Sequence, residues 1–343
     1  MKRLAPIASV ASLCAALATA LTPSSVFAWG GSGHRMIGVG AMKALPADLP
    51  AFLKAPQAIV DVGEYSREPD RIKRAGKAFD SDRDQGHFFD MNDDGTALGG
   101  PKATALPPTR QDYEKALQAV GADSWKAGYL PYSILEDYQQ VMQDFAYWKA
   151  LKFAESNPAW AAHKAFFTAD RVRREQQILI DIGYLSHFVG DGSQPLHVSV
   201  HFNGWGDYPN PGGYSTSRTF HSDFEGALVR LSVTQADVDK AMAPLRVNAG
   251  GLDIAQVGAY LAATGAQVVP LYELEKAGGL KPGDPRGAAF ATRQIAIGAS
   301  ELRDLLVMAW QGADKQTVGW RPIPLADILS GKTDPYNAFY AID

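Results

Sequence analysis

Two long segments in the middle of the chain carry apolar side chains at helical spacing. In residues 132–154 these side chains follow an i, i+3, i+4, i+7 stripe, and residues 159–190 continue it through Ile178, Ile182 and Leu185. Patterns of strand-like alternation are scarce. The same helical spacing predicts further helices at 33–45, 218–231, 253–276 and 284–312. The sequence therefore predicts an all-α fold, a single-domain helical bundle.

The first residues of the chain have the pattern of a secretory signal. Lys2 and Arg3 precede an uncharged apolar stretch at 5–21, and Val26 and Ala28 place small residues before a cleavage point. Cleavage there would remove residues 1–28 and with them Cys14, the single cysteine. A mature domain at 29–343 would have no cysteine nucleophile, no Cys-ligated zinc and no iron–sulfur cluster. We therefore expect a secreted or periplasmic protein.

Net charge and hydropathy argue against a strongly basic polyanion binder and against a membrane-spanning protein. The chain holds 37 Asp and Glu residues against 33 Lys and Arg, two of which lie in the predicted signal. This mildly acidic balance argues against the nonspecific electrostatic binding of polyanions that basic nucleic-acid-binding proteins show. No apolar run after residue 28 reaches the roughly 20 residues that cross a bilayer. We expect no stable membrane span, and a monomer by default.

The histidines are the residues whose spacing most clearly indicates a metal-binding site. His187 and Asp191 are four residues apart on a predicted helix, which places both side chains on one face. His197 follows beyond a proline, and His221 and Glu225 repeat the four-residue spacing on a later helix. Helical bundles build multinuclear metal sites from such pairs on different helices. Nitrogen and oxygen donors without sulfur favour zinc where imidazoles dominate.

Further motifs follow one another along the chain. Trp29-Gly30 and Gly33-His34 come directly after the predicted cleavage point. They are followed by Glu68-Pro69-Asp70-Arg71, Gly86-His87-Phe88-Phe89-Asp90, the H-x3-D-x5-H run from His187 to His197, and Phe220-His221-Ser222-Asp223-Phe224-Glu225. In content and order the chain resembles the zinc-dependent phospholipase C and S-one/P-one nuclease superfamily. The motifs span residues 29–225, and the C-terminal third offers no ligand that we can place.

The resemblance implies a bundle of the phospholipase C and P-one nuclease type with three zinc ions per chain. The first ion would be held by Asp70, His87, His187 and Asp191, and the second by His197, His221 and Glu225. The third would be held by His34 and by the free amine and carbonyl of Trp29, with Asp191 bridging the first and third. Zinc sites of this kind activate water for attack on phosphorus, and Asp70 would orient or deprotonate that water.

Several neighbouring residues have more than one interpretation. Asp61 is an alternative to Asp70, although the sequence context favours Asp70. His201 would either support a ligand or lie in a solvated loop. Trp205, Tyr208 and Tyr214, in the loop between His197 and His221, would stack on a nucleobase, surround a choline cation, or pack the loop itself.

The motifs leave the substrate open between two branches of the superfamily. Glu225 as the last ligand, the string around it and the absence of cysteine after residue 28 favour a phospholipase C that cleaves phospholipid head groups. The alternative is an endonuclease that hydrolyses single-stranded DNA or RNA. A third reading is an exported zinc-binding protein without catalysis, which the complete set of ligand positions disfavours.

Overall fold

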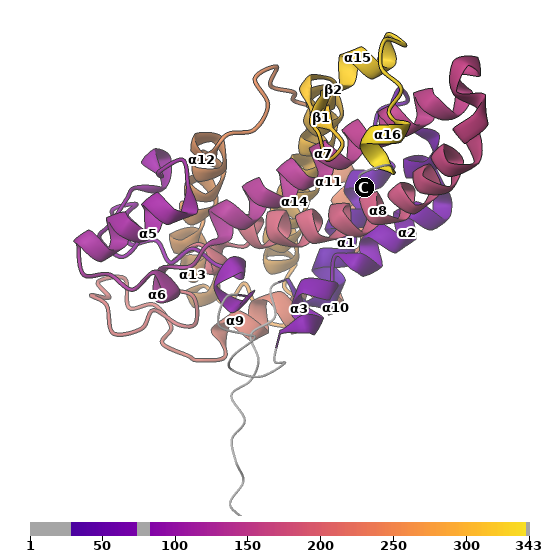
Figure 1. The fold of residues 1–343 in the computed structure, drawn as a ribbon. Coiled ribbons are helices and arrows are strands. Elements are labelled where there is room, and N and C mark those ends of the chain that lie inside the picture. Colours follow the sequence, from indigo (N-terminus) through magenta and orange to yellow (C-terminus); the bar gives the residue numbers. More distant parts are fainter. Residues whose placement is uncertain (1–28, 74–82, 341–343) are drawn as a thin grey trace, which may run out of the picture.

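The computed structural model describes residues 29–73 and 83–340. The predicted signal segment, residues 1–28, lies outside the described residues. The described chain is mostly helical, with one small two-stranded sheet, so the predicted all-α fold is confirmed. Figure 1 shows the long helices running side by side, with shorter helices and loops gathered at both ends.

Four helices form the frame of the bundle. α7 (Leu130–Ser156) and α8 (Lys164–Ser193) are joined by the short 3-10 helix η4 (Pro158–His163), which returns the chain so that the two helices pack along one another. α14 (Pro285–Gly312) packs against both of them, and α1 (Gly30–Lys43) packs against α8 and α14. The core of the molecule lies between these helices.

Shorter elements surround the frame. The other α-helices are α2 (Pro56–Tyr65), α3 (Glu68–Ile72), α5 (Arg110–Ala119), α6 (Ser124–Ala127), α9 (Phe220–Ser222), α10 (Val229–Ser232), α11 (Gln235–Ala241), α12 (Ile254–Gly265), α13 (Val268–Lys276), α15 (Leu325–Leu329) and α16 (Tyr336–Phe339). The 3-10 helices are η1 (Ala51–Lys54), η2 (Asp84–His87), η3 (Ala103–Ala105), η5 (Pro195–His197) and η7 (Ala313–Lys315), and η6 (Asp223–Leu228) is a π-helix. Strands β1 (Thr317–Val318) and β2 (Ile323–Pro324) pair antiparallel, with Thr317 opposite Pro324.

Local sequence explains where the later helices begin. Asp284 caps α14 by accepting a hydrogen bond from the Arg286 N–H, and Pro285 occupies the first turn, where its missing N–H costs nothing. α12 begins with a capping box in which Asp253 and Gln256 each bond the backbone of the other. Both starts agree with the predicted segments to within one residue.

Three predicted helices differ from the structure in detail. The segment expected as one helix from residue 159 is a 3-10 turn up to His163, because Trp160 adopts non-helical angles. The helix expected at 218–231 begins at Phe220 and passes through the π-helix η6. The helix expected at 253–276 breaks at residues 266–267. Pro270 lies four residues beyond Ala266 and has no N–H to continue the helix there.

Among the described residues, one segment is long and apolar enough to cross a membrane by length and composition alone. It is Ile254–Lys276, with a mean hydropathy of 1.2, and it comprises α12, the break and α13. Val257, Leu261 and Leu271 from this segment are buried in the core of the bundle.

Small residues let α1 approach α8 and α14 closely. A Cβ added at Gly190 of α8 would lie 2.9 Å from Ile37 Cδ1 and 3.0 Å from His34 Nδ1. A Cβ at Gly298 of α14 would lie 2.9 Å from Ser193 Oγ. The three helices therefore meet at the C-terminal end of α8, where the predicted ligands lie.

Candidate metal centre

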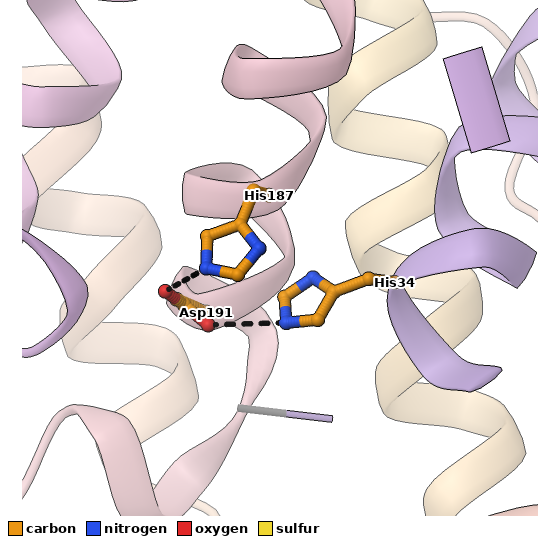
Figure 2. A group of neighbouring side chains, drawn as sticks. All are labelled: His34, His187 and Asp191. Carbon is orange, nitrogen blue, oxygen red and sulfur yellow. Dashed lines mark ion pairs between the residues drawn. The ribbon is translucent and has the colours of Figure 1, made fainter. Parts of the chain in front are cut away.

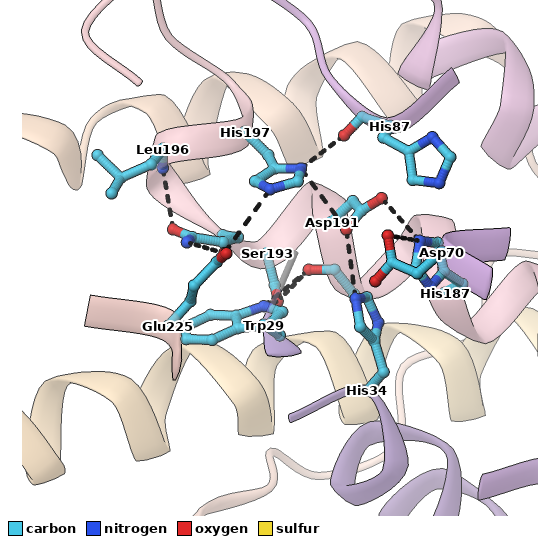
Figure 3. Close-up of polar contacts among 12 residues, drawn as sticks. Trp29, His34, Asp70, His87, His187, Asp191, Ser193, Leu196, His197 and Glu225 are labelled. Atoms are coloured by element: carbon cyan, nitrogen blue, oxygen red, sulfur yellow. Dashed lines mark hydrogen bonds and ion pairs between the residues drawn. The ribbon is translucent and has the colours of Figure 1, made fainter. Parts of the chain in front are cut away.

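The last turns of α8 carry the residues on which the centre is built. His187 and Asp191 lie one helical turn apart, and both are completely buried. The chain then turns through η5, which brings His197 back to the same place. Figure 3 shows these side chains pointing toward residues from α1, α3 and the segment that holds Glu225.

The first group joins α8 to α1. His34 Nε2 lies 3.5 Å from Asp191 Oδ1, and His187 Nε2 lies 3.3 Å from Asp191 Oδ2 (Figure 2). The two imidazole rings stack with centroids 3.9 Å apart. One ligand atom from each of the three residues lies within 4.8 Å of the others, close enough to hold one metal ion together.

The second group uses His187 again. Asp70, in the short helix α3, and His87, at the end of η2, each place a ligand atom within 4.8 Å of one from His187. The Lys73 ammonium lies 3.0 Å from Asp70 Oδ1, and its side chain is only 9% exposed. The positively charged Lys73 side chain is thus held beside the second group. The sequence motifs did not predict this contact.

The third group lies beyond η5. His197, His221 and Glu225 offer ligand atoms within 4.8 Å of one another. His221 Nε2 lies 2.8 Å from Glu225 Oε2, and His197 Nε2 lies 3.8 Å from the same oxygen. Glu225 is in the π-helix η6, a form of helix that occurs often at functional sites.

Backbone carbonyls orient three of the imidazoles. The Nδ1 atoms of His187, His87 and His197 lie 2.8, 2.7 and 2.6 Å from the carbonyl oxygens of Ser66, Arg83 and His87. A carbonyl can only accept, so each Nδ1 carries the proton and donates. Each Nε2 therefore keeps its lone pair and faces the groups, as metal-binding histidines in proteins do.

Burial fixes the charge state of these side chains in the metal-free protein. It lowers the pKa of His187 to about 4 and the pKa values of His34, His197 and His221 to about 3, so the imidazoles are neutral. Burial also raises the pKa of Asp191 to about 7. Neutral imidazoles are the form that binds a metal.

The donor atoms fit metal ions because the protein itself leaves them unpaired. Among the described residues no hydrogen-bond partner exists for Nε2 of His87, His187 and His197, both ring nitrogens of His34, and both carboxylate oxygens of Asp191. A buried polar atom left without a partner costs about 1–3 kcal/mol. Cations shared among these atoms would satisfy several of them at once.

Eight of the nine predicted ligands thus lie in three buried groups that can hold metal ions, all except Trp29. Trp29 is completely buried, and its indole Nε1 donates to the Gly190 carbonyl and to Ser193 Oγ, both at 2.9 Å. Its backbone is left-handed, with φ 33°, and its carbonyl accepts from the Gly33 N–H at 3.1 Å. The expected role of its amine and carbonyl stays a prediction.

The alternatives to these ligands lie elsewhere. Asp61 accepts a hydrogen bond from Gln57 on the exposed side of α2 and belongs to none of the three groups. His201 is buried rather than solvated: it stacks on Trp205 with centroids 3.7 Å apart, and its Nε2 lies 3.0 Å from Asp93. Trp205 and Tyr214 pack against each other, as expected for loop-packing aromatics.

A pocket of about 650 Å³ opens beside the groups. His87, His197 and His221 form part of its wall. The remaining lining residues are Lys73, Asp84, Gln85, Phe88, Asp90, Leu98, Trp125, Lys126, Leu196, Phe202 and Tyr208. Trp125, Phe202 and Tyr208 are each between 43% and 46% exposed, so the pocket is lined by partly exposed aromatic residues. Lysines and aromatic rings from four separate segments meet here, a convergence that their sequence positions do not reveal.

Asp90 is the unusual polar residue in this pocket. Its Oδ1 is buried and has no hydrogen-bond partner among the described residues, and burial raises the pKa of its carboxyl group well above the ordinary value. The Oδ1 atom can therefore form a hydrogen bond with a polar group of a bound molecule.

The chain matches no protein-family model and no curated protein. Its resemblance to the phospholipase C and S-one/P-one nuclease superfamily therefore stays a prediction that rests on the motifs.

Proposed function

We propose that this protein is a zinc-dependent phosphodiester hydrolase that acts on single-stranded nucleic acid. The observation that carries the proposal is that the three buried groups of potential metal ligands lie beside a pocket of about 650 Å³. The groups are His34 with His187 and Asp191, Asp70 with His87 and His187, and His197 with His221 and Glu225. The donors are imidazole nitrogens and carboxylate oxygens, which supports zinc. Bound zinc ions would supply Lewis acidity toward phosphoryl oxygens and activate water near neutral pH.

The residues around the groups suit a phosphodiester. The Lys73 ammonium is nearly buried beside Asp70 and lines the pocket, so it can pair with a phosphate oxygen at a place where water screens charge weakly. Lys126 lines the same pocket and adds a second positive charge. Asp70 can accept a proton from, or orient, a water molecule near the phosphorus.

The pocket favours a nucleic-acid strand as the substrate. Trp125, Phe202 and Tyr208 offer partly exposed rings, and Phe88 adds a fourth. Proteins that bind single strands combine such rings, on which bases stack, with lysines that follow the phosphates. One phospholipid head group would use only one or two of these rings.

A phospholipid is the second candidate, and Asp90 favours it. In its ionised form, a carboxyl group that shares a pocket with Phe88 and Tyr208 can pair with a quaternary ammonium such as choline, which aromatic rings also bind. The motif around Glu225 points to the same branch of the superfamily.

The test offers zinc-loaded protein single-stranded DNA and phosphatidylcholine micelles side by side, each with and without a chelator. We expect chelator-sensitive cleavage of the DNA, which Phe202→Ala slows while the zinc content stays unchanged. Cleavage of phosphatidylcholine alone would replace the nuclease with the phospholipase. Zinc binding without turnover of either substrate would favour a non-catalytic zinc-binding protein.

A further inference from the structure

Gln194 contacts three of the proposed ligands, although it is not itself a proposed ligand. It follows the end of α8 and is completely buried. Its N–H donates to the Asp191 carbonyl at 3.0 Å, and its carbonyl accepts from the His197 N–H at 2.9 Å. Its side-chain Nε2 donates to Glu225 Oε2 at 3.2 Å.

The orientation of the Gln194 amide follows from its other contact. Its Oε1 accepts a hydrogen bond from the Leu196 N–H at 2.9 Å. A backbone N–H can only donate, so the atom that faces it must be the amide oxygen. The NH2 group then has to face Glu225. The same side chain therefore caps the turn that presents His197 and holds the carboxylate that shares a group with His197.

We propose that Gln194 is a positioning residue of the metal centre: by holding Glu225 against the turn of His197 it sets the metal affinity of the group His197, His221 and Glu225. The inference rests on the metal-binding part of the proposed function. Glu225 comes from η6 and His197 from η5, two elements far apart in the sequence. The Gln194 side chain bridges them directly, so its loss removes one hydrogen bond that orients the carboxylate while the ligand atoms remain.

Two variants separate this role from capping of the turn. Gln194→Met removes both side-chain hydrogen bonds at nearly the same volume. Gln194→Asn keeps a side chain that caps a helical turn well, but it is one methylene too short to reach Glu225 as well. If the contact with Glu225 matters, both variants weaken metal binding, and Gln194→Asn does so while the turn stays capped.

The experiment measures Zn²⁺ binding by competition with a chromophoric chelator, and Co²⁺ binding by its absorption spectrum. We expect both variants to lose about 10–100-fold in affinity for one ion, the usual effect of removing a partner of a metal ligand, while the other ions stay bound. Gln177→Met makes the same change at an exposed position of α8 and should bind metal as the unaltered protein does. Denaturation of the metal-free variants checks that they fold.

A double-mutant cycle tests the route through Glu225. In a Glu225→Ala background, Gln194→Met should cause no further loss of affinity, because the carboxylate it positions is gone. The inference is overturned if the unaltered protein and both Gln194 variants bind the ion equally. It is also overturned if Gln194→Met weakens binding as much without Glu225 as with it. If the unaltered protein binds no ion, the metal centre itself fails, and this inference with it.

Discussion

Replacing Gly190 with alanine should displace one proposed ligand without removing any ligand atom. The new methyl group would lie 2.9 Å from Ile37 Cδ1, 3.0 Å from His34 Nδ1 and 3.3 Å from His34 Cε1. Ordinary van der Waals contacts begin near 3.4 Å. Either α1 moves away from α8 by about 0.5 Å, or the His34 ring turns away from Asp191. Such overpacking typically costs about 1–3 kcal/mol.

The way in which the strain is relieved decides whether the cost lowers the stability of the metal-free protein or its affinity for metal. Because His34 has no hydrogen-bond partner among the described residues, turning its ring breaks little in the metal-free protein. The cost should then fall on the metal-bound form. Since about 1.4 kcal/mol is a factor of ten, metal affinity of the group His34, His187 and Asp191 should drop about tenfold to hundredfold.

The assay is metal content per chain after dialysis against buffered free zinc, together with denaturant unfolding of the metal-free protein. Gly226→Ala is the matched control: it is next to Glu225, and a Cβ there meets nothing within 4 Å. That variant should keep its metal and its stability. Unchanged zinc affinity and unchanged stability in Gly190→Ala would refute the close approach of α1 and α8 described above.

Three further outcomes are expected. Asp191→Asn should lower zinc content and turnover more than Glu225→Asp, since Asp191 faces both His34 and His187; equal and mild effects in elemental analysis and rate assays would mean that it does not bridge. A chain that retains one residue before Trp29 should bind one zinc fewer, with unchanged circular dichroism, than a chain that starts at Trp29; equal zinc content would remove the N-terminal amine as a ligand. Burial raises the pKa of Asp137 to about 8, so the folded protein holds a proton that the unfolded chain releases above about pH 4. The free energy of unfolding should therefore fall as pH rises from about 4 toward 8. Asp137→Asn should stabilise the metal-free protein most near pH 8 and least near pH 4 in denaturant titrations. A stability difference that does not change with pH would contradict this.

Much of the fold and of the candidate site could be predicted because local patterns determine them. The four-residue spacing of His187 and Asp191 on a helix requires the two side chains to share a face, and α8 places them so. The same holds for His221 and Glu225, although a π-helix replaces the expected α-helix. The break near residue 266 had a local signal as well, because Pro270 interrupts the helical hydrogen bonds.

The rest depends on contacts between distant segments, which spacing does not encode. Lys73 is nearly buried because the chain around α3 folds against the second group, and nothing in its sequence context marks it as a pocket residue. Trp125 and Phe202 are far apart in the sequence and line one pocket only after the bundle has formed. The position of Gln194 before a proline does not predict its hydrogen bond to Glu225, which depends on the packing of two separate segments.

The sharing of His187 between two groups has a consequence for how the centre fills. Its Nδ1 donates to the Ser66 carbonyl, so one lone pair, on Nε2, serves both the group with His34 and Asp191 and the group with Asp70 and His87. One lone pair binds one cation. Once an ion is bound to this lone pair, the other group must bind its own ion with one donor fewer. The same holds in the opposite order of binding, so the antagonism is reciprocal. The metal-free protein should therefore take up its ions in an order, with a strong early step and a weaker later one, rather than as independent equivalent sites.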